Sequence, residues 1–216
     1  LPLAAAGPTL VIDIGGGTSD IAIISGGDII QSTSLKIAGD DFDASIIQYF
    51  KDKYKLLIGE RSAEQIKIEL ASAVFFENQA QLETKTLKGR DLVSGLPKSI
   101  NVTSNQIYEA IHEQLAMIAR AAKELLEDTQ PEIASDIMEK GILLTGGGAL
   151  IGSIDVFLSE YLNVSAIRAN QPMSCVAIGT GIMLDLIQSG KLQRTNLSWQ
   201  QKVARYFSRL KRRLIG

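Results

Sequence analysis

The chain has 216 residues, 45% hydrophobic and 21% charged, which is enough to bury a core and is typical of a globular protein. A single cysteine excludes an internal disulfide, and no apolar run approaches the roughly 18 residues of a membrane-spanning helix. The net charge is −2, but residues 1–190 carry 24 acidic and 14 basic groups; this acidic body argues against general nucleic-acid binding, so no nucleic-acid partner is expected.

The N-terminal stretch LPLAAAGP has neither the basic start nor the long apolar segment of a secretory signal. It also lacks an initiating Met, and we therefore expect the sequence to be a piece of a longer protein.

Two β-rich runs, residues 10–14 and 21–24, flank the segment GGGTSD and predict a β-hairpin. The three glycines at 15–17 lack a Cβ, so another group can approach this backbone closely. Successive N–H groups in such a turn form an anion-binding concavity. With two hydroxyls and a carboxylate beside them, they predict a phosphate-binding hairpin with Asp13 near Mg²⁺. A tight hairpin without a ligand is the alternative.

The first half of the chain continues with elements that turn residues and hydrophobic spacing delimit. A third strand would complete an antiparallel meander, and Ser62 is a suitable N-cap for the second helix. Residues 74–103 predict a small peripheral sheet. The expected elements are a strand at 28–34, helices at 41–54 and 62–73, and short strands at 82–87 and 100–102.

In the second half, the longest predicted helix carries an apolar stripe that faces a core. His112 lies off this stripe and is expected in solvent, whereas Cys175 is expected in the core. The predicted elements are helices at 105–128, 131–141, 153–162 and 175–187 and strands at 142–145 and 164–169.

The segment TGGGAL follows the strand at 142–145 and precedes a helix. A helix N-terminus offers free N–H groups and a positive dipole end, so this segment is a second candidate for binding phosphate or a nucleoside. The chain has no GxxxxGK[ST] motif, and its glycines do not match GxGxxG at the start of a helix. A nucleotide would therefore be bound by another architecture.

These motifs resemble the actin/Hsp70/sugar-kinase superfamily, and more closely its bacterial actin (MreB) family. VIDIGGGTSDIAIIS resembles the second phosphate loop of the superfamily, and TGGGAL resembles its adenosine motif. The resemblance covers roughly residues 8 to 190, and GERSAEQIK is its most specific part. Further matching stretches are IAGDDFDASIIQYFKDKYKLLIGERSAEQIKIEL (37–70), TSNQIYEAI (103–111) and PEIASDIMEKGILLTGGGALI (131–151).

The resemblance implies a split site for ATP or ADP with Mg²⁺. The hairpin would contact the β- and γ-phosphates, Asp13 would lie near Mg²⁺ through water, and Thr18 would help to position the attacking water. Residues 64–67 would approach the ribose and base. The implied nucleotide-binding residues are Gly15, Gly16, Gly17, Thr18, Glu64, Gln65, Ile66, Lys67, Gly146, Gly147, Gly148, Ala149 and Leu150. From the residues alone, a surface i,i+3 ion pair is the preferred explanation of Glu64 and Lys67.

The resemblance also implies the fold, an α/β actin-like ATPase second lobe. We expect an RNase H-like mixed sheet with helices on both faces, formed by residues 1–40 and 104–190, with a small α+β subdomain inserted at 41–103. The implied function is an ATP-binding bacterial actin that forms filaments at the inner face of the plasma membrane and organises cell-wall synthesis in rod-shaped cells. Implied partners are further copies of the chain, the inner membrane surface and cell-shape membrane proteins of the RodZ and MreC type.

In this family the first phosphate hairpin and a glutamate that polarises the hydrolytic water precede the matched region. Because phosphoryl transfer needs charge stabilisation from both sides of the phosphate, we expect this chain alone to hydrolyse ATP negligibly. Alternatives are a lobe of an Hsp70-type or sugar-kinase-type ATPase, or an actin-fold adaptor that does not hydrolyse ATP.

The C-terminal segment, residues 191–216, carries eight Lys and Arg and no acid, whereas the other 190 residues carry 14 basic and 24 acidic groups. At about 100° per residue, its apolar side chains from Trp199 to Leu214 share one side of a helix and most of its basic side chains share the other. This pattern predicts a basic amphipathic helix at a membrane surface or on a partner; docking on the chain's own acidic body is the alternative.

Overall fold

The computed structural model describes residues 7–189, and the chain divides into two compact units between Cys175 and Val176. The part of the second unit that the structure describes is almost entirely helix α6 (Cys175–Gln188). The predicted amphipathic helix at 198–214 lies outside the described residues. Among the described helices, none is both long enough and apolar enough to cross a bilayer.

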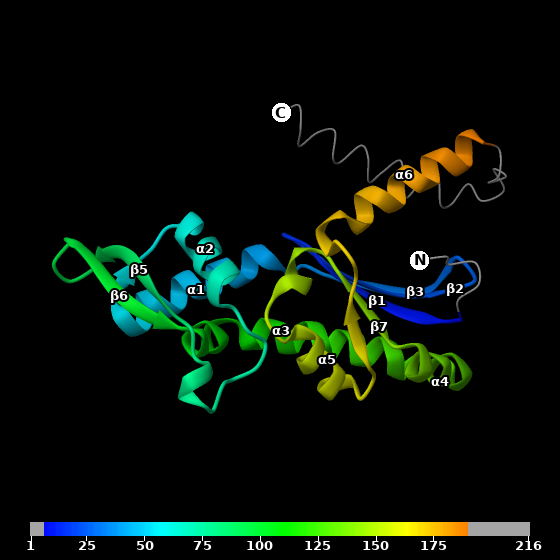
Figure 1. The fold of residues 1–216 in the computed structure, drawn as a ribbon, viewed down its shortest axis with the longest axis horizontal. Helices are drawn as coiled ribbons and strands as arrows, with labels where there is room; N and C mark the ends of the chain where they lie inside the picture. The colour runs from blue at the N-terminus through cyan, green and yellow to red at the C-terminus, as the bar shows by residue number, and fades with distance from the viewer. Residues whose placement is uncertain (1–6, 190–216) are drawn as a thin grey trace. The chain divides into compact units, whose positions relative to one another are not determined.

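The first unit is built on a five-stranded mixed sheet, which confirms the predicted α/β class and the antiparallel meander (Figure 1). β1 pairs with β2 antiparallel and with β7 parallel, so the meander joins the second half of the chain through β1. In the order β3-β2-β1-β7-β8, the strands are Asp28–Leu35, Ser19–Ser25, Thr9–Ile14, Ile142–Thr145 and Ala166–Arg168.

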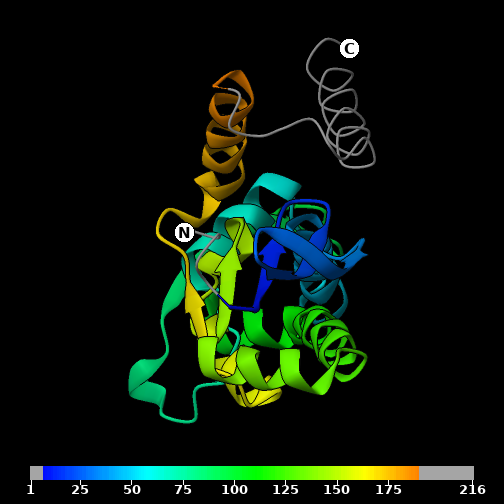
Figure 2. The same cartoon turned by 90° about the vertical axis from the view of Figure 1, so that its right-hand side faces the viewer.

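One face of this sheet is the core of the unit. Side chains alternate between the two faces of a strand, and in β1 Leu10, Ile12 and Ile14 are buried while Val11 and Asp13 are only half-buried. Three helices lie against the buried face (Figures 1 and 2): α3 (Ser104–Glu127), α4 (Pro131–Lys140) and α5 (Ile154–Leu162). The apolar stripe predicted for α3 is buried along its whole length.

A second, three-stranded sheet extends the first unit at the end seen on the left of Figure 1. Its strands β4 (Leu56–Leu57), β5 (Thr84–Asp91) and β6 (Pro97–Thr103) are antiparallel, and helices α1 (Gly39–Tyr54) and α2 (Glu60–Leu70) pack beside them. The predicted strand at 82–87 ends too early, because β5 continues to Asp91. Gly89 lies within β5, where an added Cβ would come within 2.5 Å of the Leu57 carbonyl oxygen, so the glycine lets β5 approach β4.

Helix α2 begins earlier than predicted. Gly59, rather than Ser62, precedes its first turn, because the amides of Ser62 and Ala63 already donate to the Gly59 carbonyl. The helix ends at Leu70 rather than near Ala73, since the backbone beyond it pairs with Gly152 instead.

The predictions for the burial of His112 and Cys175 have different outcomes. His112 is exposed, as predicted. The prediction for Cys175 is wrong: the side chain is only partly buried, and its thiol lies 3.5 Å from the carbonyl oxygen of Gln171. Cys175 follows the short 3-10 helix at Pro172–Ser174 and begins α6, so it stands at the edge of the first unit rather than inside it.

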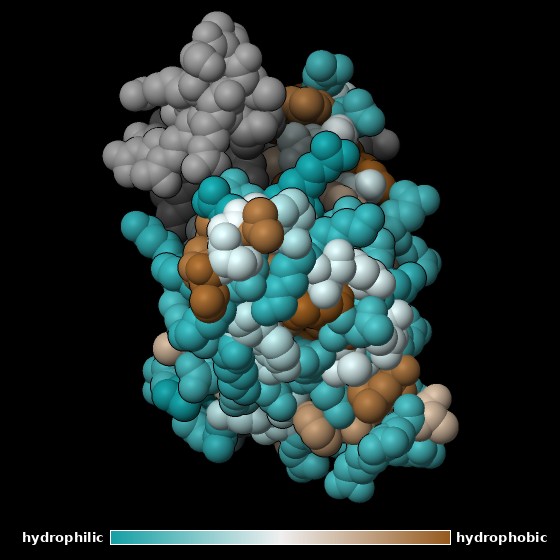
Figure 3. All heavy atoms as spheres, turned by 90° about the vertical axis from the view of Figure 1, so that its left-hand side faces the viewer, coloured by the Kyte–Doolittle hydropathy of each residue, from teal (hydrophilic) through white to brown (hydrophobic). Residues whose placement is uncertain are grey.

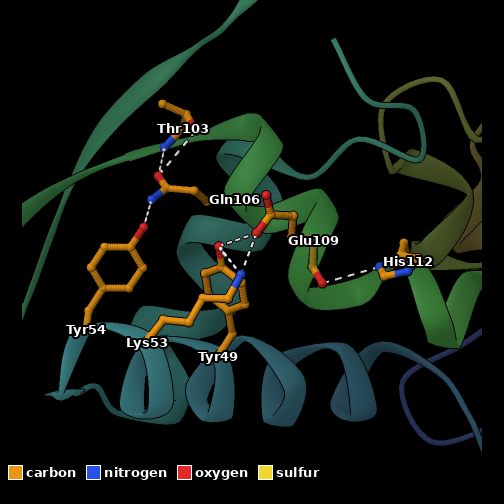
Figure 4. A network of polar contacts seen from close by, with 7 residues as sticks. All are labelled: Tyr49, Lys53, Tyr54, Thr103, Gln106, Glu109 and His112. Carbon is orange, nitrogen blue, oxygen red and sulfur yellow. Dashed lines mark hydrogen bonds and ion pairs between the residues drawn. The ribbon is translucent and has the colours of Figure 1, made fainter. Parts of the chain in front are cut away.

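A polar network fastens the end of α1 to the beginning of α3 (Figure 4). The Glu109 carboxylate accepts hydrogen bonds from the Lys53 ammonium and the Tyr49 hydroxyl, each at 2.7 Å. The Gln106 amide group donates to the Tyr54 hydroxyl and accepts from the backbone N–H of Thr103. Lys53 and Tyr49 lower the pKa of Glu109 from its ordinary value of 4.5, while burial and the neighbouring carboxylate raise the pKa of Tyr49.

We expect Glu109→Gln to lower the thermal midpoint at neutral pH. A lowered pKa of Glu109 in the folded state means that its charge stabilises the fold above pH 4.5 and that this contribution is lost as the pH falls through the folded-state value. The Glu109 side chain is 43% exposed, so solvent screening limits the effect to less than about 1 kcal/mol. Thermal unfolding at pH 7 and below pH 4 measures it; Glu113→Gln on the same helix is the control.

Candidate functional site

The glycine turn between β1 and β2 leaves several backbone donors available. Its first amide, Gly15 N–H, donates to the Thr18 carbonyl at 2.9 Å. Within residues 7–189, the amides of Gly16, Gly17 and Thr18 make no hydrogen bond. The carbonyls of Gly15 and Gly16, in contrast, accept from Gly39 and Asp40 at the start of α1, at 3.0 and 2.8 Å. The turn therefore has the carbonyls of Gly15 and Gly16 occupied and its amides at 16–18 available, an arrangement that suits an anion site.

Asp13 lies at the end of β1 between two polar neighbours. Its register partner in β2 is Asp20 and its partner in β7 is Thr145. Burial is the main reason why the pKa of Asp13 is raised; a hydrogen bond from Thr145 opposes this, and the charge of Asp20 adds to it. The Thr18 hydroxyl donates to Asp20 at 3.2 Å. These side chains form a compact acidic group beside the free amides.

The second glycine segment folds directly over the end of β1. Gly146 has a φ of +80°, and a Cβ there would overlap the Ile14 carbonyl oxygen and the Asp13 carboxylate. A Cβ at Gly148 would overlap the Ile14 side chain. Gly147, by contrast, has nothing within 4 Å of an added Cβ. Two glycines thus permit packing, while the third faces open space. The segment continues as a 3-10 helix, Gly147–Leu150, with Ala149 buried and Leu150 half-exposed.

The four residues predicted on α2 differ in their surroundings. Glu64 and Gln65 are exposed, whereas Ile66 is 3% exposed and packs in the core. The Lys67 ammonium lies 2.8 Å from the Asp43 carboxylate and 2.9 Å from the Gly39 carbonyl oxygen. The alternative of a surface ion pair between Glu64 and Lys67 is therefore wrong, because Lys67 turns towards α1.

Backbone hydrogen bonds and one side-chain hydrogen bond bring the three predicted segments together. Gly39 and Asp40 join the glycine turn to α1, and Lys67 joins α1 to α2. Beyond α2, the Gly152 amide donates to the Ala71 carbonyl at 3.0 Å, and the Ala73 amide donates to the Gly152 carbonyl at 2.8 Å. Residues 15–18, 64–67 and 146–150 thus border one connected region, although they are far apart in the sequence.

Sequence reasoning included Asp20 only as the carboxylate that follows the glycine turn. It assigned no individual role to Gly39, Asp43 and Thr145, which the structure also places in this region. The positions of these three depend on tertiary contacts. Among the described residues, no group of three or more His, Cys, Asp or Glu side chains could hold a metal ion by itself. A cation at Asp13 would therefore depend on ligand oxygens and water.

The comparisons with known proteins agree with this architecture. The structure superposes on MreB5 of Spiroplasma citri, crystallised with ADP, with a TM-score of 0.83 and 39% identity over 88% of this chain and 57% of that chain. The structure of the same protein bound to AMPPNP superposes with a TM-score of 0.82. The MamK double helical filament, at 20% identity and a TM-score of 0.64, shows the shared fold alone. The chain is therefore an actin-like protein.

The particular family follows from the sequence. Residues 1–192 match the MreB/Mbl protein family. The cell shape-determining protein Mbl of Bacillus subtilis is 52% identical over 189 residues, and MreB of Escherichia coli is 42% identical over 187. These alignments cover 88% and 87% of this chain but 55% and 53% of the relatives, so the chain spans about half their length. The chain belongs to the MreB/Mbl family of cell shape-determining actin-like proteins, rather than to the Hsp70-type or sugar-kinase-type ATPases.

Gly148→Ala and Gly147→Ala form a matched pair that tests the packing of the second glycine segment. Gly148→Ala forces a methyl group into Ile14, so we expect it to destabilise the fold by roughly 1–3 kcal/mol. Gly147→Ala meets open space, so we expect a change within about 0.5 kcal/mol. Urea denaturation measures both; equal destabilisation by the two variants would contradict this account of the turn.

Proposed function

We propose that this chain binds ATP or ADP with Mg²⁺, as part of a cell-shape protein that assembles into actin-like filaments. The observation that carries the proposal is the glycine turn, whose amides at 16–18 are free while its carbonyls at 15 and 16 are held by α1. The open space at Gly147, next to the same strand end, supports it. Related structures of MreB5 were crystallised with ADP and AMPPNP, which supports a nucleotide as the ligand.

The residues of the region fit such a ligand. The free amides of Gly16, Gly17 and Thr18 would bind the β- and γ-phosphates, and Asp13 would face Mg²⁺ through water. Burial and the charge of Asp20 disfavour an ionised Asp13, and a divalent cation would relieve both effects. In this proposal Thr18 positions the attacking water, and the 146–150 segment passes beneath the nucleoside. For the chain by itself we propose binding with negligible hydrolysis; phosphate release equal to that of a full-length homologue would contradict this.

Asp13→Asn tests the nucleotide site. We expect it to weaken the binding of MgADP about 10- to 100-fold, the range found when residues that orient a metal's ligands are replaced. The loss should be small for ADP in EDTA, because Asp13 acts through the cation. Titration of a fluorescent ADP analogue measures the affinity, with Asp28→Asn at the far end of the meander as the control. An unchanged affinity for MgADP would exclude Asp13 from the site.

Filament formation is the second part of the proposal, and its support is the exposed tip of the small sheet. Leu92, Val93 and Leu96 in the β5–β6 connection are 44%, 84% and 65% exposed. Figure 3 views the molecule from this side and shows small hydrophobic patches among hydrophilic residues. Such apolar side chains suit a contact with another copy of the chain. We propose that residues 74–103 contribute to this contact.

Val93→Ser combined with Leu96→Ser tests the filament contact. We expect the double variant to lower the fraction of protein that pellets with MgATP at least about threefold, since its apolar contact area is lost. Lys88→Gln, also exposed on this hairpin, is the matched control and should pellet like the unchanged chain. Pelleting with and without ATP also separates a polymer from a non-hydrolysing adaptor. Intact filaments of the double variant in electron micrographs would exclude this tip from the contact.

We also propose a cytoplasmic location at the inner face of the plasma membrane, with cell-shape membrane proteins of the RodZ and MreC type as partners. Family membership and the basic amphipathic pattern of residues 198–214 support it. Sedimentation with anionic vesicles tests it, comparing the chain with one that ends at Leu197. Equal partitioning of the two would argue against a membrane role for the tail.

A further inference from the structure

The ion pair between α2 and α1 occupies an unusual place. The Lys67 ammonium is 2.8 Å from Asp43 Oδ2 and 2.9 Å from the Gly39 carbonyl oxygen, and both charged side chains are only 15% exposed. A lysine ammonium has three protons to donate. Two of them are directed by these acceptors, which fixes the direction of the third. The position of Lys67 is therefore set by α1 and not by its own helix.

The same stretch of α1 also holds the glycine turn. Gly39 donates its N–H to the Gly15 carbonyl at 3.0 Å, while its own carbonyl accepts from Lys67. Asp40 donates to the Gly16 carbonyl at 2.8 Å. A Cβ at Gly39 would lie 3.3 Å from the Gly15 oxygen and 3.6 Å from the Lys67 nitrogen, so there is little slack between them. The first turn of α1 is thus a link between the turn that carries the free amides and helix α2.

The ion pair between Asp43 and Lys67 contributes little to the stability of the fold. Burial raises the pKa of Asp43 even though Lys67 opposes the change, so the folded state disfavours the charged carboxylate relative to the unfolded chain. The second carboxylate oxygen, Oδ1, is buried without a hydrogen-bond partner within the described part of the chain. Removing these two charges from water costs free energy, and the attraction between them does not fully offset that cost. A role in geometry accounts better for its presence.

We infer that Asp43 is a positioning residue for nucleotide binding, which holds Lys67 against the first turn of α1 so that α2 and the glycine turn keep one relative geometry. The inference rests on the proposed nucleotide function. It adds a residue that contacts no ligand itself and acts through Lys67 and Gly39. Loss of the Asp43 charge releases the Lys67 ammonium towards solvent and loosens the hydrogen bonds that Gly39 and Asp40 donate to the turn.

Hydrogen exchange without nucleotide tests the link directly. In Asp43→Asn we expect the amides of Gly39 and Asp40 to exchange about tenfold faster, because the local opening that exposes them becomes easier. The matched control is Asp52→Asn, which removes a carboxylate on the same helix that accepts from Gln48 at the surface; it should leave these amides unchanged. Unchanged exchange in Asp43→Asn would overturn the inference whether or not the chain binds nucleotide.

A double-mutant cycle with MgADP tests how Asp43 acts. We expect Asp43→Asn to weaken MgADP binding about tenfold in the unchanged background and less than about twofold in a Lys67→Met background. Both variants and the neutral double variant are compared at temperatures below their unfolding midpoints. A tenfold loss in both backgrounds would show that Asp43 acts independently of Lys67 and would overturn the inference. If the unchanged chain does not bind MgADP, the proposed function fails, and the exchange experiment still decides the link.

Discussion

The close approach of the 146–148 turn to the end of β1 is the contact on which the site depends. Parallel pairing sets Thr145 beside Asp13, and the next residues must cross the strand end where Ile14 leaves no room for a Cβ at 146 or 148. Because this crossing is possible, the chain can continue to Gly152 and pair there with the backbone after α2. At these two positions glycine is needed because it lets two segments approach closely, and not because it makes the backbone flexible.

The features of the fold that depend on residues close together in the sequence could be predicted from the sequence. The β-rich runs around glycines predict the meander, and the apolar spacing predicts the stripe of α3. Each pattern arises because one face of the element is buried. The two-residue strand β4 is too short to give such a pattern. A glycine such as Gly89 is typical of the end of a strand, although Gly89 lies inside β5. Its role is set by the Leu57 backbone on another strand, which no local pattern contains.

The site shows the same division. The glycine turn was predictable from three adjacent residues, whereas the partners of its carbonyls lie more than twenty positions away at Gly39 and Asp40. Lys67 was predicted only through the family resemblance, and its contact with Asp43 crosses from one helix to another. A spacing of three on α2 favoured Glu64 as its partner, but burial against α1 offers Lys67 both a carboxylate and a carbonyl. The tertiary contact therefore prevailed over the local pair.

Helix α1 gives this arrangement a mechanical consequence. At 1.5 Å per residue, its sixteen residues span about 24 Å, from Gly39 at the glycine turn to Tyr54. The next carbonyl, of Lys55, accepts the Leu92 amide at 2.8 Å, at the exposed tip of the small sheet. The network around Glu109 holds the far end of the helix to α3, so α1 is fixed near both ends by different contacts. One continuous helix and the hydrogen bond between Lys55 and Leu92 therefore connect the proposed nucleotide site to the proposed filament contact without an intervening loop.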